Sequence, residues 1–102
     1  MAGFVRVARL SDVPPGSMKA VLAGQENVAL INLDGQIFAL DDTCTHAYCS
    51  AAAGEQEGDR VTCLCHGSSF SVRTGEVLVP PAKEPLRTYR VLIEGEDILV
   101  EG

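Results

Sequence analysis

Long apolar runs and basic residues are both scarce in this chain of 102 residues. No apolar stretch approaches the roughly 20 residues that span a bilayer. The N-terminal segment interrupts its apolar residues with Arg6 and Arg9 and lacks the apolar core of a signal peptide. The 8 basic residues against 14 acidic ones give a net charge of −6 and no basic stripe for phosphate groups. We therefore expect a cytoplasmic protein that binds neither membranes nor nucleic acid.

The acidic excess has two interpretations, and the sequence leaves both open. Carboxylates gathered on one face would steer the protein onto a basic partner surface and speed their encounter. Carboxylates spread over the whole surface would only keep the protein soluble. The choice depends on where the charges lie in space, which the sequence does not show.

Short apolar segments separated by turn residues predict an all-β fold. Strands are expected at residues 4–8, 18–22, 28–33, 36–40, 60–62, 70–72, 76–79, 86–93 and 98–100. Asp34-Gly35 is a strong signal for a two-residue hairpin, whereas residues 51–58 are small or acidic and are expected to form a loop. No helical periodicity, repeat or linker interrupts this pattern, so residues 1–102 are expected to form a single domain.

Cysteine and histidine are few, but all of them lie in two short segments. Four cysteines and two histidines occur in the whole chain, in the segments 44–49 and 63–66. Each segment offers one thiolate and one imidazole to a common site, spaced C-x-H and C-x-x-H; these four are Cys44, His46, Cys63 and His66. Two thiolates and two imidazoles suit a [2Fe–2S] cluster with cysteines on one iron and histidines on the other. A tetrahedral zinc ion accepts the same donor types, but its usual ligand spacings differ from these.

This ligand pattern resembles that of the Rieske ferredoxins and Rieske domains. The likeness continues beyond the ligands through Gly67-Ser68-Ser69-Phe70, Thr74-Gly75, Pro80-Pro81-Ala82, Pro85-Leu86 and Tyr89-Arg90-Val91. The resemblance implies a Rieske fold of stacked antiparallel β-sheets, with residues 1–102 as one domain and one [2Fe–2S] cluster between loops at about residues 42–54 and 62–71. It also implies that Cys44 and Cys63 bind one iron, that His46 and His66 bind the other near solvent, and that the proline loop around Pro81 covers the cluster.

The two further cysteines carry a second implication of the resemblance. Rieske proteins of respiratory cytochrome complexes have a disulfide at the positions that match Cys49 and Cys65, whereas many dioxygenase ferredoxins lack it. The resemblance thus implies a Cys49–Cys65 disulfide that ties the two loops together. The alternative is a pair of free thiols in a reducing cytosol.

Ser68 and Phe70, which follow the second segment, stand at positions that affect the reduction potential of the cluster in related proteins. In high-potential relatives a serine at the position of Ser68 donates its hydroxyl to a cluster sulfur and raises the potential; the alternative is a turn serine that bonds only to backbone. Phe70 stands where those relatives have a tyrosine that donates to a ligand sulfur. Phenylalanine has no hydroxyl, so one tuning bond should be missing; simple packing of Phe70 in the core is compatible with this.

Charged residues near the two segments are expected to lie at the surface. Asp41 and Asp42 precede the first segment and are expected to form a solvated strand end. Three basic residues near the proline loop are expected mainly to keep the surface soluble; these are Lys83, Arg87 and Arg90.

The resemblance implies a monomeric one-electron carrier that is not itself an enzyme. It would take electrons from a flavin-dependent reductase and pass them to a terminal non-haem iron oxygenase, docking near His46 and His66. The extra cysteines and Ser68 favour an alternative, a Rieske subunit of a respiratory, arsenite-oxidase-type or nitrite-reductase-type complex. A structural zinc module, or a thiol redox sensor that uses Cys49 and Cys65, is a third hypothesis.

Overall fold

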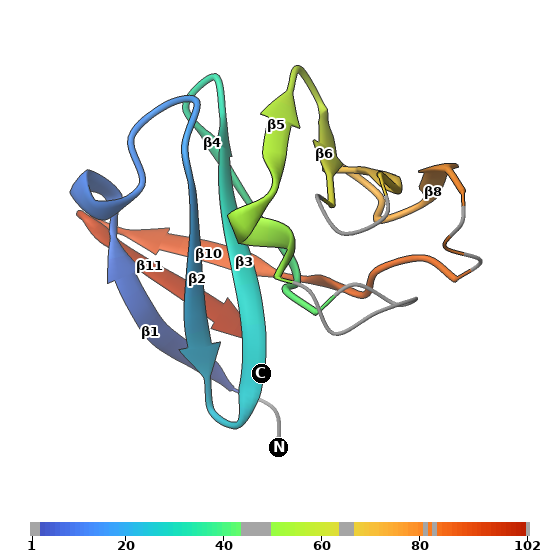
Figure 1. The fold of residues 1–102 in the computed structure, drawn as a ribbon. Helices are drawn as coiled ribbons and strands as arrows, with labels where there is room; N and C mark the ends of the chain where they lie inside the picture. The colour runs from blue at the N-terminus through green and yellow to red at the C-terminus, as the bar shows by residue number, and fades with distance from the viewer. Residues whose placement is uncertain (1–2, 44–49, 64–66, 81, 83, 102) are drawn as a thin grey trace.

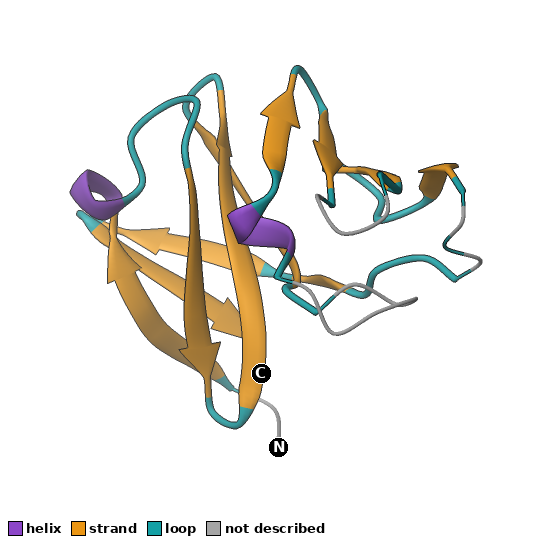
Figure 2. Ribbon diagram, viewed as in Figure 1, coloured by secondary structure: helices purple, strands orange, loops and turns teal. Residues whose placement is uncertain are grey.

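The computed structural model describes residues 3–43, 50–63, 67–80, 82 and 84–101. Regular structure in these residues consists of β-strands and two single-turn 3-10 helices, η1 (Leu10–Asp12) and η2 (Ala51–Ala53), as Figure 2 shows. The predicted all-β fold is therefore confirmed. No helix in the described part of the chain is long and apolar enough to cross a membrane. Six of the predicted site residues lie outside the described residues: Cys44, His46, Cys49, Cys65, His66 and Pro81.

The strands form three antiparallel sheets (Figure 1). The terminal sheet has the order β1-β11-β10, from β1 (Phe4–Arg9), β11 (Asp97–Glu101) and β10 (Val91–Glu94). The central sheet has the order β2-β3-β4-β9, from β2 (Met18–Ala23), β3 (Glu26–Leu33), β4 (Gln36–Asp41) and β9 (Thr88–Tyr89). The small sheet has the order β5-β6-β7-β8, from β5 (Glu55–Glu57), β6 (Arg60–Thr62), β7 (Ser69–Ser71) and β8 (Val77–Val79).

Strand β3 lies between the two hydrophobic cores of the domain. Its alternate residues point to opposite faces of the central sheet. Val28 and Leu30 pack with residues of the terminal sheet, whereas Ala29 and Ile31 pack with residues of the small sheet. A strand that is buried on both faces reads as a nearly continuous apolar run, which is the pattern of this segment. The small sheet, which carries Cys63 at the end of β6, is thereby fixed against the rest of the domain.

The hairpin between β3 and β4 follows the sequence prediction. Asp34 and Gly35 both adopt positive φ angles, 52° and 94°, as a type I′ turn requires. The Asn32 side chain accepts a hydrogen bond from Gly35 N–H at 2.7 Å and donates one to the Val13 carbonyl at 2.7 Å. These bonds fix the turn at the end of β4 that is farther from the first cysteine-histidine segment.

Two local predictions were wrong. Residues 51–58, expected to be a loop, contain the strand β5, whose residues are polar and pair with β6 through their backbone. Residues 86–93, expected to be one strand, are divided between β9 and β10. The chain changes partner at this point, because Tyr89 pairs with β4 of the central sheet and Val91 pairs with β11 of the terminal sheet.

Candidate metal centre

Cys63 is the predicted ligand that the structure describes, and it is buried. It directly follows β6, is 1% exposed and forms no disulfide. Its N–H donates to the carbonyl of Ser68 at 2.8 Å, and its own carbonyl accepts from Gly67 N–H at 2.9 Å. Gly67 has a φ of +76°, a conformation that glycine adopts without strain. These two bonds close the base of the second ligand loop.

The base of the first ligand loop is closed by Asp42. Its Oδ1 atom accepts hydrogen bonds from Ser50 Oγ at 2.8 Å and from Ala52 N–H at 2.9 Å. Thr43 and Ser50 also form an isolated antiparallel bridge. Asp42 is only 7% exposed, so the prediction of a solvated strand end was wrong for this residue. Asp42 directly follows β4 and its side chain is buried. Its carboxylate, and not water, therefore accepts the hydrogen bonds from Ser50 Oγ and Ala52 N–H.

Gly54 brings the bases of the two ligand loops together. A Cβ atom at this position would lie 2.0 Å from the carbonyl oxygen of Thr62, the residue before Cys63. Only glycine allows two backbones to approach this closely. Ala51 and Cys63 accordingly belong to the same hydrophobic cluster.

Residues of the proline loop also pack around Cys63. The buried side chains of Ala82 and Leu86 pack in the cluster that contains Cys63. Ala82 N–H donates to Ser68 Oγ at 3.0 Å. Three segments that are distant in the sequence thus meet around one buried thiol.

The two tuning positions are both fully buried. Ser68 is 0% exposed, and the hydroxyl oxygen accepts the bond from Ala82. Phe70 pairs with Val61 across β6 and β7 and packs in the hydrophobic cluster. Its packing agrees with the core role weighed from the sequence. The donation by Ser68 to a cluster sulfur and the tuning bond missing at Phe70 stay predictions.

A polar network joins the end of β4 to β9. Tyr89 donates a hydrogen bond to Asp41 Oδ1 at 2.5 Å, and Arg87 bonds to the Tyr89 hydroxyl. Arg87 also pairs with Glu26 at 3.3 Å and with Asp41 at 3.7 Å. Burial, reinforced by the bond to Asp41, raises the pKa of Tyr89 to about 12. Arg87 therefore does more than keep the surface soluble: it helps to hold Asp41, three residues before Cys44.

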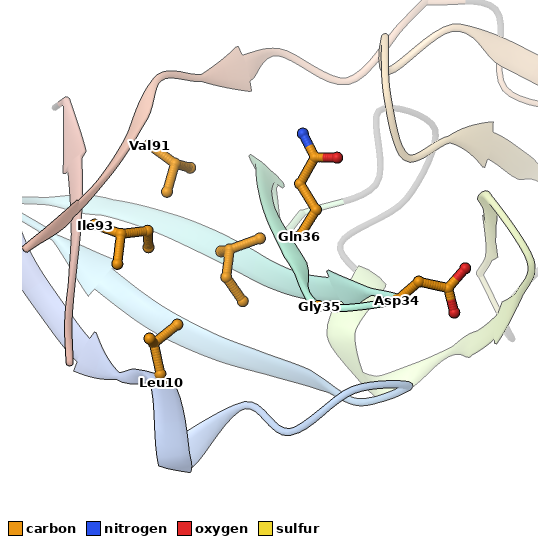
Figure 3. A pocket seen from close by; sticks show the side chains of 7 residues that line it. Leu10, Asp34, Gly35, Gln36, Val91 and Ile93 are labelled. Carbon is orange, nitrogen blue, oxygen red and sulfur yellow. The ribbon is translucent and has the colours of Figure 1, made fainter. Parts of the chain in front are cut away.

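One pocket formed by described residues lies away from this region. A cavity of about 570 Å³ is found between the β3–β4 turn, η1 and β10 (Figure 3). Figure 3 shows its apolar side chains, Leu10, Val91 and Ile93, on one side and the polar residues Asp34 and Gln36 on the other. It lies at the start of β4, whereas the first ligand loop follows the end of β4. The described lining holds one ionisable side chain, Asp34, and so offers no pair of groups for acid–base catalysis.

The donor set and its surroundings fit an iron–sulfur cluster. Cys63 presents a buried thiol with no disulfide partner, among apolar side chains that exclude water. Metal thiolates in electron carriers need such a shell, because the surroundings control solvent access and the local dielectric. Within the described ranges no group of three or more Cys, His, Asp or Glu side chains lies close enough to hold a metal, so no second site competes there with the predicted one.

Sequence reasoning missed the residues that close the loops. Asp42, Gly54 and the network of Arg87 with Tyr89 carry no metal-ligand signature. The available signal was position, since Asp42 comes two residues before Cys44 and Gly54 comes five residues after Cys49. Their partners are distant in the sequence, and only the fold identifies them.

Comparison with known proteins gives the family. The profile of the Rieske [2Fe-2S] domain matches residues 3–90. The biphenyl dioxygenase ferredoxin subunit of Pseudomonas sp. (strain KKS102) is 42% identical over 99 residues, which cover 96% of this chain and 91% of that protein. The ferredoxin of Sphingomonas yanoikuyae B1 superposes with a TM-score of 0.92 at 31% identity, covering 98% of this chain and 99% of that one.

A third similarity is to a ferredoxin solved with its partner. A chain in the complex of reduced oxygenase and oxidized ferredoxin of carbazole 1,9a-dioxygenase superposes with a TM-score of 0.91 at 32% identity, covering 97% of this chain and 93% of that one. The fold, the buried thiol and these similarities define an all-β iron–sulfur electron-transfer protein. The chain belongs to the Rieske [2Fe-2S] domain family, and its cofactor is one Rieske [2Fe–2S] cluster.

Proposed function

We propose that this chain is the one-electron carrier of a multicomponent oxygenase. It accepts electrons from a flavin-dependent ferredoxin reductase and passes them singly to a terminal non-haem iron oxygenase. The proposal rests on one observation: the chain is 42% identical to a dioxygenase ferredoxin subunit, and the alignment covers 96% of this chain and 91% of that protein. Such a subunit is an electron-transfer component and not a catalyst. The similarity to a ferredoxin solved in complex with its oxygenase supports the proposal that a terminal oxygenase accepts the electrons.

The proposed ligands are Cys44 and Cys63 on one iron and His46 and His66 on the other. Residues 1–102 form a single Rieske domain in this proposal, with cluster-binding loops at about residues 42–54 and 62–71. The cofactor, when bound, takes up and releases one electron. Of the protein groups, Cys63 supplies a thiolate from the water-free core, and Asp42 and Ser68 fix the bases of the two loops.

The second cysteine pair is proposed to form the Cys49–Cys65 disulfide found in respiratory-type Rieske proteins. Its support is the close approach of the loop bases at Gly54 and Thr62, since each loop carries one of the two cysteines. A bridge inaccessible to exchange survives in a reducing compartment. Mass spectrometry of a non-reduced digest tests this directly: the two peptides should travel as one, and separate free-thiol peptides would refute the bridge.

The proposed carrier is a monomer of the cytoplasm that docks near His46 and His66. The net charge of −6 supports docking onto a basic surface of the reductase or oxygenase. Association steered in this way slows steeply as ionic strength rises. A reduction rate that stayed constant between low and high salt would contradict this docking mode.

Protein-film voltammetry combined with rapid reduction tests the function. We expect the as-isolated protein to show the visible absorption of a Rieske cluster and a reversible wave near about −150 mV that is flat through neutral pH. A flavin-dependent ferredoxin reductase should reduce it anaerobically, and a terminal oxygenase should reoxidise it. A potential of about +100 mV or higher that falls with pH from neutrality would instead favour the respiratory-type alternative. A colourless zinc protein would refute both.

A further inference from the structure

The connection between β8 and β9 is anchored to the small sheet at two points. This connection, residues 80–86, is the proline loop described above. We call it the proline strap, since prolines occupy positions 80, 81 and 85. Near its middle, Ala82 N–H donates to Ser68 Oγ at 3.0 Å. At its end, Leu86 N–H donates to the carbonyl of Gly75 at 2.8 Å. Proline fixes φ, and Pro85 lies between the two anchors, directly before Leu86.

The anchor at Gly75 is built into the backbone. A Cβ atom on Gly75 would lie 2.0 Å from the Leu86 carbonyl oxygen, so the two backbones are in close contact there. The Leu86 side chain is also buried in the hydrophobic cluster. This end of the strap therefore stays closed without help from any polar side chain. At the other anchor, Ala82 adds one polar contact, its hydrogen bond to Ser68, to the burial of its own side chain.

Ser68 connects the strap to the second ligand loop through two different atoms. Its backbone carbonyl accepts the Cys63 N–H at 2.8 Å, and its side-chain oxygen accepts the Ala82 N–H at 3.0 Å. Ser68 is 0% exposed, so water does not compete for either bond. One residue thus ties the backbone of a predicted ligand to the segment that packs beside it.

The neighbouring Ser69 provides a contrast. It is also buried, but its hydroxyl pairs with Thr62 Oγ1 at 2.9 Å across β6 and β7. Loss of the Ser68 hydroxyl removes a buried hydrogen bond near Cys63, and loss of the Ser69 hydroxyl removes a partly buried one. Only the Ser68 bond reaches the strap, so the two serines separate a local effect on the strap from a general effect on stability.

We propose that Ser68 is a positioning residue that holds the proline strap against the second ligand loop and thereby limits access of water and chelators to the cluster. The role uses the acceptor side of the hydroxyl, and it rests on the proposed function because it takes Cys63 as a ligand. The oxygen lone pair bonds Ala82, and the Ser68 proton is left over for a separate bond. Closing the strap and tuning the potential are therefore distinct properties of one side chain.

Hydrogen–deuterium exchange of the cluster-loaded protein tests the proposal. In Ser68→Ala the strap amides should exchange about five- to a hundredfold faster, the factor that corresponds to loss of one buried hydrogen bond. Bleaching of the cluster absorption by an iron chelator should quicken in the same variant. Ser69→Ala should raise exchange in β6 and β7 instead and leave the strap at the wild-type rate. Strap exchange in Ser68→Ala that stays within twofold of wild type, or that equals the value in Ser69→Ala, would overturn the proposal.

A second variant breaks the same bond from its other side. Ala82→Pro removes the N–H donor and leaves the Ser68 hydroxyl in place. We expect it to reproduce the faster bleaching of Ser68→Ala. Bleaching at the wild-type rate in a folded Ala82→Pro protein, together with fast bleaching in Ser68→Ala, would show that Ser68 acts on the cluster directly and would refute the strap role. A wild-type protein without a Rieske spectrum would instead refute the proposed function, which the exchange data do not test.

Discussion

Substitution of Asp42 by alanine should loosen the first ligand loop. The change removes the acceptor for Ser50 Oγ and Ala52 N–H, which lie 2.8 Å and 2.9 Å from Oδ1. Hydrogen bonds to charged groups contribute about 1.5–3 kcal/mol each. Ser50 is only partly buried and regains water, so we discount its bond and expect a total loss of about 2–4 kcal/mol in the free energy of unfolding.

A loss of this size is large for a domain of this length. Each kcal/mol lowers the melting temperature of a domain of about 60–100 residues by about 4–8 °C, so Asp42→Ala should melt about 10–25 °C lower than wild type. Thermal unfolding followed by circular dichroism measures the shift, and iron content per chain measures retention of the cluster. Asp42→Asn is the matched control, because its amide oxygen still accepts both bonds, and it should lose less than half as much.

The reasoning fails if Asp42→Ala melts within about 3 °C of wild type and keeps its full iron content, a shift worth less than about 1 kcal/mol. It also fails if Asp42→Asn is as damaged as Asp42→Ala. In that case the charge of the carboxylate, and not its geometry as an acceptor, would stabilise the loop.

Three further predictions concern the surroundings of the site. Gly54→Ala forces a Cβ to within 2.0 Å of the Thr62 carbonyl oxygen, so the backbones must separate; we expect a loss of about 1–3 kcal/mol in chemical denaturation, and wild-type stability would refute the close approach. The pKa of Tyr89 is raised to about 12 in the folded state from the ordinary 10.0, so the folded state holds its proton more tightly than the unfolded state. Stability from this group is complete below pH 10 and falls as the pH rises from 10 to 12; Tyr89→Phe should flatten that decline in denaturation curves, and an unchanged slope would contradict it. Cys63→Ser should abolish the electron paramagnetic resonance signal of the reduced cluster while the far-ultraviolet circular dichroism stays β-like, and a retained signal would remove Cys63 from the ligand set.

The sequence alone determined the family and the outline of the fold. Short-range patterns of apolar residues predicted the strands. The Asp34-Gly35 hairpin was predicted by residue types that tolerate positive φ. Metal donors are equally local signals, because thiolate and imidazole are the groups that bind iron and their spacing reports a common site. The match to the Rieske family confirms that resemblance. The ligand set itself stays a prediction, since three of its four residues lie outside the described part of the chain.

Only the tertiary structure decided how the site is held. Asp41 and Asp42 are the same residue type at adjacent positions, yet Asp41 joins a surface network with Arg87 and Tyr89, whereas Asp42 is buried and closes the first ligand loop. The sequence contains no sign of this difference, because it arises from which face of the strand end meets the core.

The same limit applies to the glycine contact and to the strap. Gly54 and Thr62 are eight positions apart, and Ser68 and Ala82 are 14 apart. The sequence shows which hydrogen bonds each side chain is able to form. Which partner it bonds depends on the segments that burial of the shared core brings together. The chemistry of the centre was thus readable from the residues, and its closure was set by long-range packing, which exists only in the folded chain.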